Sequence, residues 1–95
     1  TNQATSEAVL SVLDNYSDRP IKMIGVDMGD TQKKAIEDGK EVGSVCQNPY
    51  GMGYATIVAG ARAALELESD KNIDSGFQWI DKNNIDLEAY ARYLY

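Results

Sequence analysis

Three polar residues lie where predicted strands end. Asp27 follows the apolar run 21–26, Gln47 follows the run 42–46, and Asn2 lies just before the first predicted helix. In open α/β sheets, ligands bind outside the carboxyl ends of the strands. A carboxylate accepts hydrogen bonds from two hydroxyls, and amides both donate and accept, so these side chains suit a polyol. The spacing is equally compatible with turn or capping roles for Asp27 and Asn2, and with Gln47 as a polar residue at a strand end.

The residue types present exclude several other kinds of chemistry. The chain has no histidine and one cysteine, Cys46, which rules out a catalytic triad, a cysteine–histidine pair and a histidine-based metal site within it. Cys46 lies in an apolar run, where a buried thiol acting as a small hydrophobic side chain is expected. The Gly-Met-Gly sequence at 51–53 has Thr56 where a dinucleotide-binding loop has its third glycine. We therefore expect no enzyme, no cofactor and no metal site.

The net charge restricts the partners of the chain. Fifteen acidic residues against nine basic ones give a formal net charge of −6. Such a field repels a phosphate backbone, which argues against nucleic acid as a partner. No apolar run approaches the roughly 18–20 residues that span a bilayer. We therefore expect a chain that neither spans a membrane nor binds nucleic acid directly.

The hydrophobic pattern predicts alternating helices and strands. Helices are expected over 4–15, 30–38, 51–67 and from 86 onward, and strands over 21–26, 42–46 and 73–80. This order is typical of an α/β fold, a parallel sheet with flanking helices. In this alternating pattern a strand should precede the first helix, but no strand is predicted before it in the sequence. We therefore expect the chain to be a fragment of a longer protein.

Periodicity also assigns side chains to faces. The apolar face of the first helix is formed by Val9, Val12, Leu13 and Tyr16, with Thr5 or Ser6 as the expected cap. The run 21–26 suits a strand buried on both faces. The helix over 51–67 is apolar most of the way round, which predicts packing on more than one side. Phe77 and Trp79 are expected in the core. The final helix carries three tyrosines expected to dock against another part of the protein, Tyr90, Tyr93 and Tyr95.

Three short stretches carry a resemblance to a known family. They are Gly-Val-Asp at 25–27, Ala-Ile-Glu-Asp-Gly-Lys at 35–40 and Val-Cys-Gln-Asn-Pro-Tyr-Gly-Met-Gly at 45–53. Together they resemble the periplasmic sugar-binding proteins of the ribose/galactose type, the type I solute-binding proteins of ABC transporters. The resemblance implies a two-lobed periplasmic-binding-protein fold with three crossover strands. Residues 1–47 would form part of the C-terminal ligand-binding lobe, a partial Rossmann-like lobe. Residues 48–95 would form a crossover, a long helix docked on the other lobe, and a terminal strand and helix.

The same resemblance implies a site and a function. Asn2, Asp27 and Gln47 fall on the family's sugar-binding positions, while Gln3 and Val26 depart from the residues usual beside them. The ligand would be a pentose or hexose, delivered by the full-length protein to an ABC-transporter permease. The location would be extracytoplasmic, in the periplasm or lipid-anchored on the outer face of the membrane. An isolated fragment would hold only part of the site, bind sugar weakly or not at all, and self-associate. The alternative is the effector-binding domain of a LacI-type sugar-responsive repressor.

Overall fold

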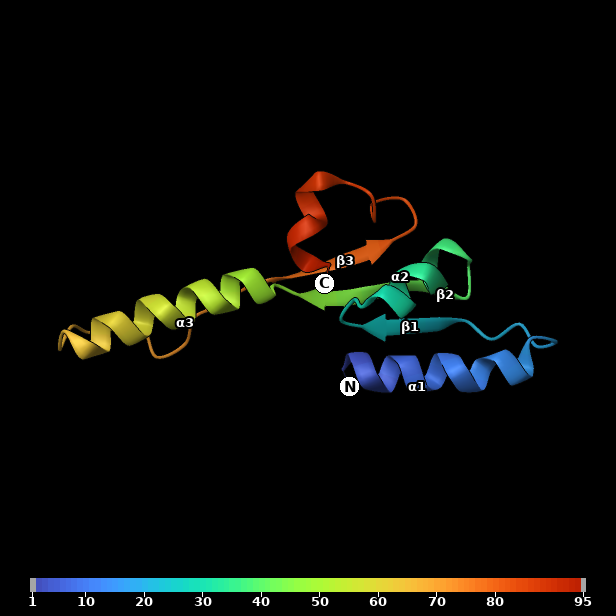
Figure 1. Cartoon of the computed structure of the whole chain (residues 1–95), viewed down its shortest axis with the longest axis horizontal. Helices are drawn as coiled ribbons and strands as arrows, with labels where there is room; N and C mark the ends of the chain where they lie inside the picture. Colours follow the sequence, from blue (N-terminus) through green and yellow to red (C-terminus); the bar gives the residue numbers. More distant parts are fainter. Residues whose placement is uncertain (1, 95) are drawn as a thin grey trace.

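A three-stranded sheet with helices around it organises the chain in the computed structural model, which describes residues 2–94. The elements in chain order are α1 (Gln3–Leu13), η1 (Asp14–Tyr16), β1 (Met23–Val26), α2 (Asp30–Glu37), β2 (Glu41–Gln47), α3 (Pro49–Ala64), β3 (Phe77–Asp81) and η2 (Glu88–Tyr93) (Figure 1). The molecule measures 59 × 25 × 17 Å because α3 extends away from the sheet. The expected α/β class is confirmed, with short 3₁₀ turns at 14–16 and 88–93.

The direction of the third strand differs from the expectation of an all-parallel sheet. The strand order is β1-β2-β3, with β1 parallel to β2 and β3 antiparallel to β2. After β2 the chain runs outward along α3 and returns, so that Phe77 pairs with Gln47 at the end where β2 left the sheet. A parallel pair needs a crossover that carries the chain back to the start of the strand. No described segment between β2 and β3 makes that crossover, and β3 therefore runs antiparallel.

A register shift in β2 sets which of its side chains face the core. Met23 pairs with Glu41 but Ile24 pairs with Gly43, so Val42 is an extra residue opposite β1. Such a bulge moves the following side chains to the other face of the strand. Glu41 and Ser44, three residues apart, are therefore both buried on one side of the sheet.

One face of the sheet carries the core. The main cluster joins β2, β3, α2 and the C-terminal segment, and consists of Met28, Ile36, Cys46, Ile80, Ile85 and Tyr93. A smaller cluster joins α1 to β1 and α2 through Leu10, Met23 and Ala35, with Leu13 against it. Cys46 is fully buried, as expected, and burial raises the pKa of its thiol to about 11. The thiol is therefore a packing group in the folded protein, protonated at neutral pH.

Helix α1 buries a different face from the one its periodicity predicted. Val9, Val12 and Tyr16 are exposed, whereas Ser6 and Leu10 are buried. The Ser6 hydroxyl accepts a hydrogen bond from the backbone N–H of Val26 (3.1 Å) and donates to the Val26 carbonyl (3.3 Å). These bonds hold α1 against the free edge of β1, so its polar Ser6 takes a buried position.

The opposite face of the sheet is exposed in the described chain. Ile24 is 64% exposed and Phe77 is 74% exposed, so the expectations that the strand over 21–26 is buried on both faces and that Phe77 is a core residue are wrong for this chain. Trp79 is half-buried because its ring lies over Gly43, where an added Cβ would be 2.4 Å from the ring. Helices α1 and α2 and the C-terminal segment pack through the core clusters on the other side, which leaves this apolar face open.

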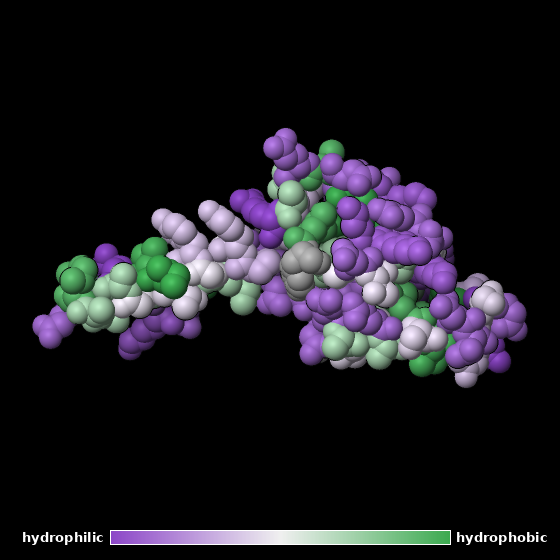
Figure 2. Space-filling view, viewed as in Figure 1, coloured by the Kyte–Doolittle hydropathy of each residue, from purple (hydrophilic) through white to green (hydrophobic). Residues whose placement is uncertain are grey.

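Helix α3 extends from the end of β2 without a buried residue. It begins after Asn48, whose Oδ1 accepts a hydrogen bond from the Gly51 N–H, and Pro49 occupies the first helical turn, where a proline is well tolerated. Tyr50, Ile57 and Leu65 are each more than 70% exposed. Figure 2 shows apolar side chains at the far end of this extension. Docking of α3 on another lobe stays a prediction. Within residues 2–94, no helix is long and apolar enough to cross a membrane.

Candidate functional site

Two of the three predicted site residues meet at the carboxyl edge of the sheet. Asp27 follows β1 and Gln47 ends β2, and these two strands are parallel, so their carboxyl ends share one edge. The Gln47 Nε2 donates a hydrogen bond to Asp27 Oδ1 at 2.8 Å. Gln47 is exposed, whereas Asp27 is only 5% exposed. We call these residues the Asp27–Gln47 pair, with Gln47 as its accessible member.

The Asp27 carboxylate is also bonded from α1. The backbone N–H of Gln3 donates to Asp27 Oδ2 at 3.3 Å, so the N-terminus of α1 is directed at the carboxylate. A helix N-terminus carries partial positive charge and favours an anion. A carboxylate has about four acceptor positions. Two are used by Gln3 and Gln47, which leaves further acceptor capacity on this largely buried carboxylate.

The backbone of Asp27 is held in an uncommon conformation. Its φ is 66°, in the left-handed region that non-glycine residues rarely adopt, although aspartate tolerates it better than most. Two hydrogen bonds fix the residue there: its N–H donates to the Val45 carbonyl at 2.9 Å, and the Ser44 hydroxyl donates to its carbonyl at 2.6 Å. Strained backbone of this kind persists only where the surroundings over-determine it.

Asn2 lies at the same edge, but its side chain caps α1. Its Oδ1 accepts hydrogen bonds from the Thr5 N–H and the Thr5 hydroxyl, both at 3.0 Å. The cap is therefore Asn2 and not Thr5 or Ser6 as the sequence suggested. Of the two roles left open for Asn2, the described structure contains the capping one. A role in ligand binding stays a prediction.

A buried polar cluster lies next to this site, and the periodicity of the sequence does not predict it. Gln32 from α2 and Glu41 and Ser44 from β2 are each at most 1% exposed. One signal was available in the sequence: Gln32 precedes Ala35 and Ile36 by three and four residues, which places it on their helix face. No comparable feature of the sequence predicts the bulge that buries Glu41 together with Ser44.

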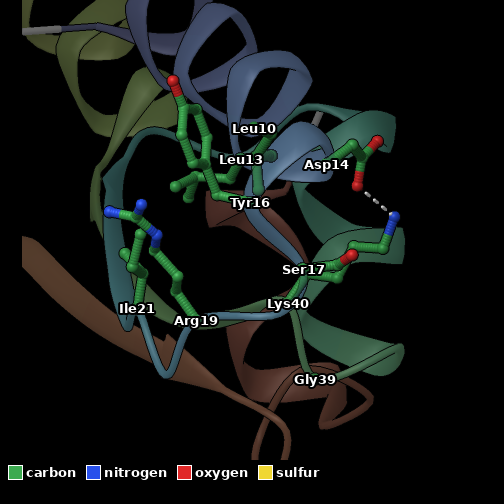
Figure 3. Close-up of a pocket in the computed structure, with 9 residues that line it drawn as sticks. All are labelled: Leu10, Leu13, Asp14, Tyr16, Ser17, Arg19, Ile21, Gly39 and Lys40. Carbon is green, nitrogen blue, oxygen red and sulfur yellow. Dashed lines mark hydrogen bonds and ion pairs between the residues drawn. The ribbon is translucent and has the colours of Figure 1, made fainter.

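A separate cavity of about 210 Å³ lies at the other end of the strands (Figure 3). Its lining comes from the end of α1 and from the segments that lead into β1 and β2. Lys40 and Asp14 form an ion pair of 2.7 Å at its rim, and Arg19 lies 5.6 Å from the centre of the Tyr16 ring. The cavity is smaller than most ligand sites and faces the amino ends of the strands, so we do not assign it to the ligand. The described residues contain no group of three metal-ligating side chains.

Two solved structures with the same fold are solute-binding proteins of transporters. An ABC transporter solute-binding protein from Agrobacterium vitis with bound D-fucose superposes with a TM-score of 0.90, at 23% identity over 99% of this chain and 33% of its own. A carbohydrate transporter solute-binding protein from Agrobacterium radiobacter in complex with D-arabinose gives 0.88, at 24% identity over 99% of this chain and 32% of its own. At this level of identity, the likeness establishes the fold.

A third solved structure is more similar in sequence over a shorter stretch. It is described as an ABC transporter, LacI family transcriptional regulator from Brachyspira murdochii, with a TM-score of 0.72 and 39% identity over 76% of this chain and 22% of its own. The present chain therefore spans about a third or less of the length of the structures it matches. No protein-family model matches the chain, and no curated protein matches it significantly.

Proposed function

We propose that this chain, which has the fold of about one third of an ABC sugar-binding protein, is part of a solute-binding protein that captures a sugar for uptake. The protein would bind its ligand without transforming it. It would act outside the cytoplasm, in the periplasm or anchored on the outer face of the membrane, and deliver the sugar to a transporter permease. The bound sugars of the two Agrobacterium structures, D-fucose and D-arabinose, favour a hexose or pentose as the ligand class.

The observation that carries this proposal is the Asp27–Gln47 pair. A carboxylate and an amide lie 2.8 Å apart at the carboxyl edge of two parallel strands, where α/β proteins bind their ligands. The carboxylate can accept hydrogen bonds from hydroxyls, and the Gln47 amide can donate as well as accept. Asn2, at the same edge, is the third proposed contact. This donor and acceptor set suits neighbouring hydroxyls of an uncharged sugar.

The exposed surfaces support the proposal that the chain is completed by a second lobe. Helix α3 has no buried residue, and apolar side chains on it remain in solvent. Large exposed apolar patches mark interaction surfaces. We propose that residues 1–47 belong to the ligand-binding lobe and that 48–95 supply a crossover, the helix that docks on the other lobe, and the terminal strand and 3₁₀ helix. The site is then shared between lobes, and this chain holds part of it.

The effector-binding domain of a sugar-responsive repressor is the second candidate. The Brachyspira structure, at 39% identity, is described as both an ABC transporter and a LacI family regulator, which favours keeping this candidate. Both functions use the same site chemistry. A basic helix-turn-helix encoded upstream would identify a repressor, whereas a signal peptide would identify a transport protein.

The proposed function is tested by titrating the full-length protein with a panel of pentoses and hexoses in a calorimeter. We expect at least one sugar, with D-fucose and D-arabinose in the panel, to bind with a dissociation constant of about 1 µM or less, equivalent to about 8 kcal/mol. Leucine serves as a control of similar size that lacks the hydroxyl pattern. Absence of any heat with every sugar at millimolar concentration would contradict the proposal.

The isolated 95-residue chain is expected to self-associate through the surfaces meant for the second lobe. Sedimentation velocity should show a sedimentation coefficient that rises with concentration, because α3 and the open sheet face expose apolar area. Replacing the exposed Ile57 and Leu65 by lysine should return the coefficient towards the monomer value. A wild-type chain that stays monomeric at high micromolar concentration would contradict this expectation.

A further inference from the structure

The buried polar cluster lies one hydrogen bond away from Asp27. It consists of Gln32, Glu41 and Ser44, which are 0%, 1% and 0% exposed. Buried polar groups cost free energy unless hydrogen bonds compensate them. Three of them side by side in a small core therefore need a physical reason beyond packing.

The cluster holds both carbonyl groups at the end of β1. Ser44 Oγ donates to the Asp27 carbonyl at 2.6 Å, and Gln32 Nε2 lies 3.3 Å from the Val26 carbonyl. Gln32 Nε2 also lies 3.5 Å from Ser44 Oγ and 3.5 Å from Glu41 Oε1. The side chains thus form a chain of contacts from Glu41 through Gln32 and Ser44 to Asp27. These contacts act on the peptide groups that set the left-handed conformation of Asp27.

The cluster packs directly on the backbone of β1. A Cβ added at Gly25 would be 2.1 Å from Glu41 Oε1, 2.6 Å from Gln32 Nε2 and 2.9 Å from Ser44 Oγ. Only a glycine permits this approach. Two of the cluster's buried atoms, Gln32 Oε1 and Glu41 Oε2, have no hydrogen-bond partner among the described atoms.

The surroundings of Glu41 favour its neutral form. Burial raises the pKa of this carboxyl above its usual value, and hydrogen bonds from Gln32, the Gly25 backbone and Ser44 oppose that rise only in part. Within residues 2–94, the groups that oppose this rise are the Gln32 amide, the Gly25 backbone and the Ser44 hydroxyl, and the titratable Cys46 thiol on β2 interacts with the charges of both Glu41 and Asp27.

We propose that Ser44, Gln32 and Glu41 form a positioning network that holds the Asp27 carboxylate in place for the sugar. This inference rests on the proposed function for its ligand. The network residues do not touch the sugar. They fix the left-handed backbone of Asp27 from the core side, while Gln3 and Gln47 bond its carboxylate from the site side.

Through the network, the geometry of the site depends on the ionisation of Glu41, and a rise in pH disturbs it. Because the folded-state pKa of Glu41 is raised, its neutral form contributes stability that is fully present below the unfolded pKa. That contribution is lost as the pH rises through the folded pKa. Sugar affinity of the wild type should therefore fall over the same interval, as the ionised carboxylate disturbs Gln32 and Ser44.

Substitutions in the full-length protein test the network through sugar affinity. Ser44→Ala removes the donor to the Asp27 carbonyl and should weaken sugar binding about 10-fold, as expected for loss of one buried hydrogen bond. Ser11→Ala is the matched control, because the exposed Ser11 hydroxyl bonds only its own helix, at the Ala8 carbonyl. Glu41→Gln keeps the shape and neutrality of the protonated acid. It should retain affinity and lose the fall in affinity at higher pH.

A second measurement does not depend on the sugar. Hydrogen exchange at the Asp27 amide, which donates to the Val45 carbonyl, should be faster in sugar-free Ser44→Ala than in Ser11→Ala. Equal affinity and equal exchange in these two variants would overturn the network. If Ser44→Ala fails to fold, the pH profile of Glu41→Gln decides, and a profile identical to the wild type overturns it. Faster exchange in a protein that binds no sugar would instead support the positioning of Asp27 and overturn only the proposed ligand.

Discussion

Replacement of Asp27 by alanine in the full-length protein is expected to weaken sugar binding by at least about 100-fold. The substitution removes the only charged acceptor of the Asp27–Gln47 pair. A hydrogen bond to a charged group contributes about 1.5–3 kcal/mol, and a carboxylate can accept from two sugar hydroxyls. Each 1.4 kcal/mol corresponds to a factor of ten in affinity. Calorimetric titration with the tightest-binding sugar measures the effect.

Asp30→Ala provides the matched control for that substitution. Asp30 is exposed in the first turn of α2, three residues from Asp27, so its replacement should leave affinity within a few-fold of the wild type. Gln47→Ala should also weaken binding while sparing the fold, because Gln47 is exposed. If Asp27→Ala folds and retains its affinity, the assignment of the site is wrong.

Replacement of Ile80 by alanine is expected to lower the free energy of unfolding of the 95-residue chain by about 2–5 kcal/mol. Ile80 is fully buried in the cluster that joins β3 to β2, α2 and the C-terminal segment. The loss combines the transfer free energy of the removed atoms with the cost of a cavity. Since a domain of this size has little stability to spare, the variant should be largely unfolded at low denaturant. Urea unfolding followed by circular dichroism measures this change.

The substitution Ile24→Ala tests whether the two faces of the sheet contribute differently to the free energy of unfolding. Ile24 lies on the open face and is 64% exposed, so at concentrations where the chain is monomeric Ile24→Ala should change the free energy of unfolding by less than about 1 kcal/mol. Comparable losses at Ile24 and Ile80 would contradict a one-sided core. In the full-length protein, a larger cost at Ile24 would indicate that another segment covers this face.

The fold class and the placement of the Asp27–Gln47 pair could be predicted from local patterns. Alternating helices and strands require an α/β arrangement, and two parallel strands necessarily bring the residues after them to one edge. The burial of Cys46 followed from its apolar neighbours. Each of these inferences depends on residues close together in the chain.

Tertiary contacts decided what short-range patterns leave open. The direction of β3 depends on how α3 returns the chain, and the exposure of Ile24 and Phe77 depends on which segments cover the sheet. Residue types alone could not assign the cap of α1 to Asn2, because the same amide suits a cap or a ligand contact. The structure shows the cap, through the Thr5 N–H, and the ligand contact stays a prediction.

Charge and periodicity are properties of neighbouring residues, and they are sufficient to predict an acidic α/β chain with an aspartate and a glutamine at one sheet edge. The meeting of Ser44, Gln32 and Glu41 beside Asp27 depends instead on how distant elements pack. A one-residue bulge in β2 turns Glu41 and Ser44 to the same face, and α2 brings Gln32 to them. Such a register shift results from how two strands pair, and hydrophobic pattern does not encode it.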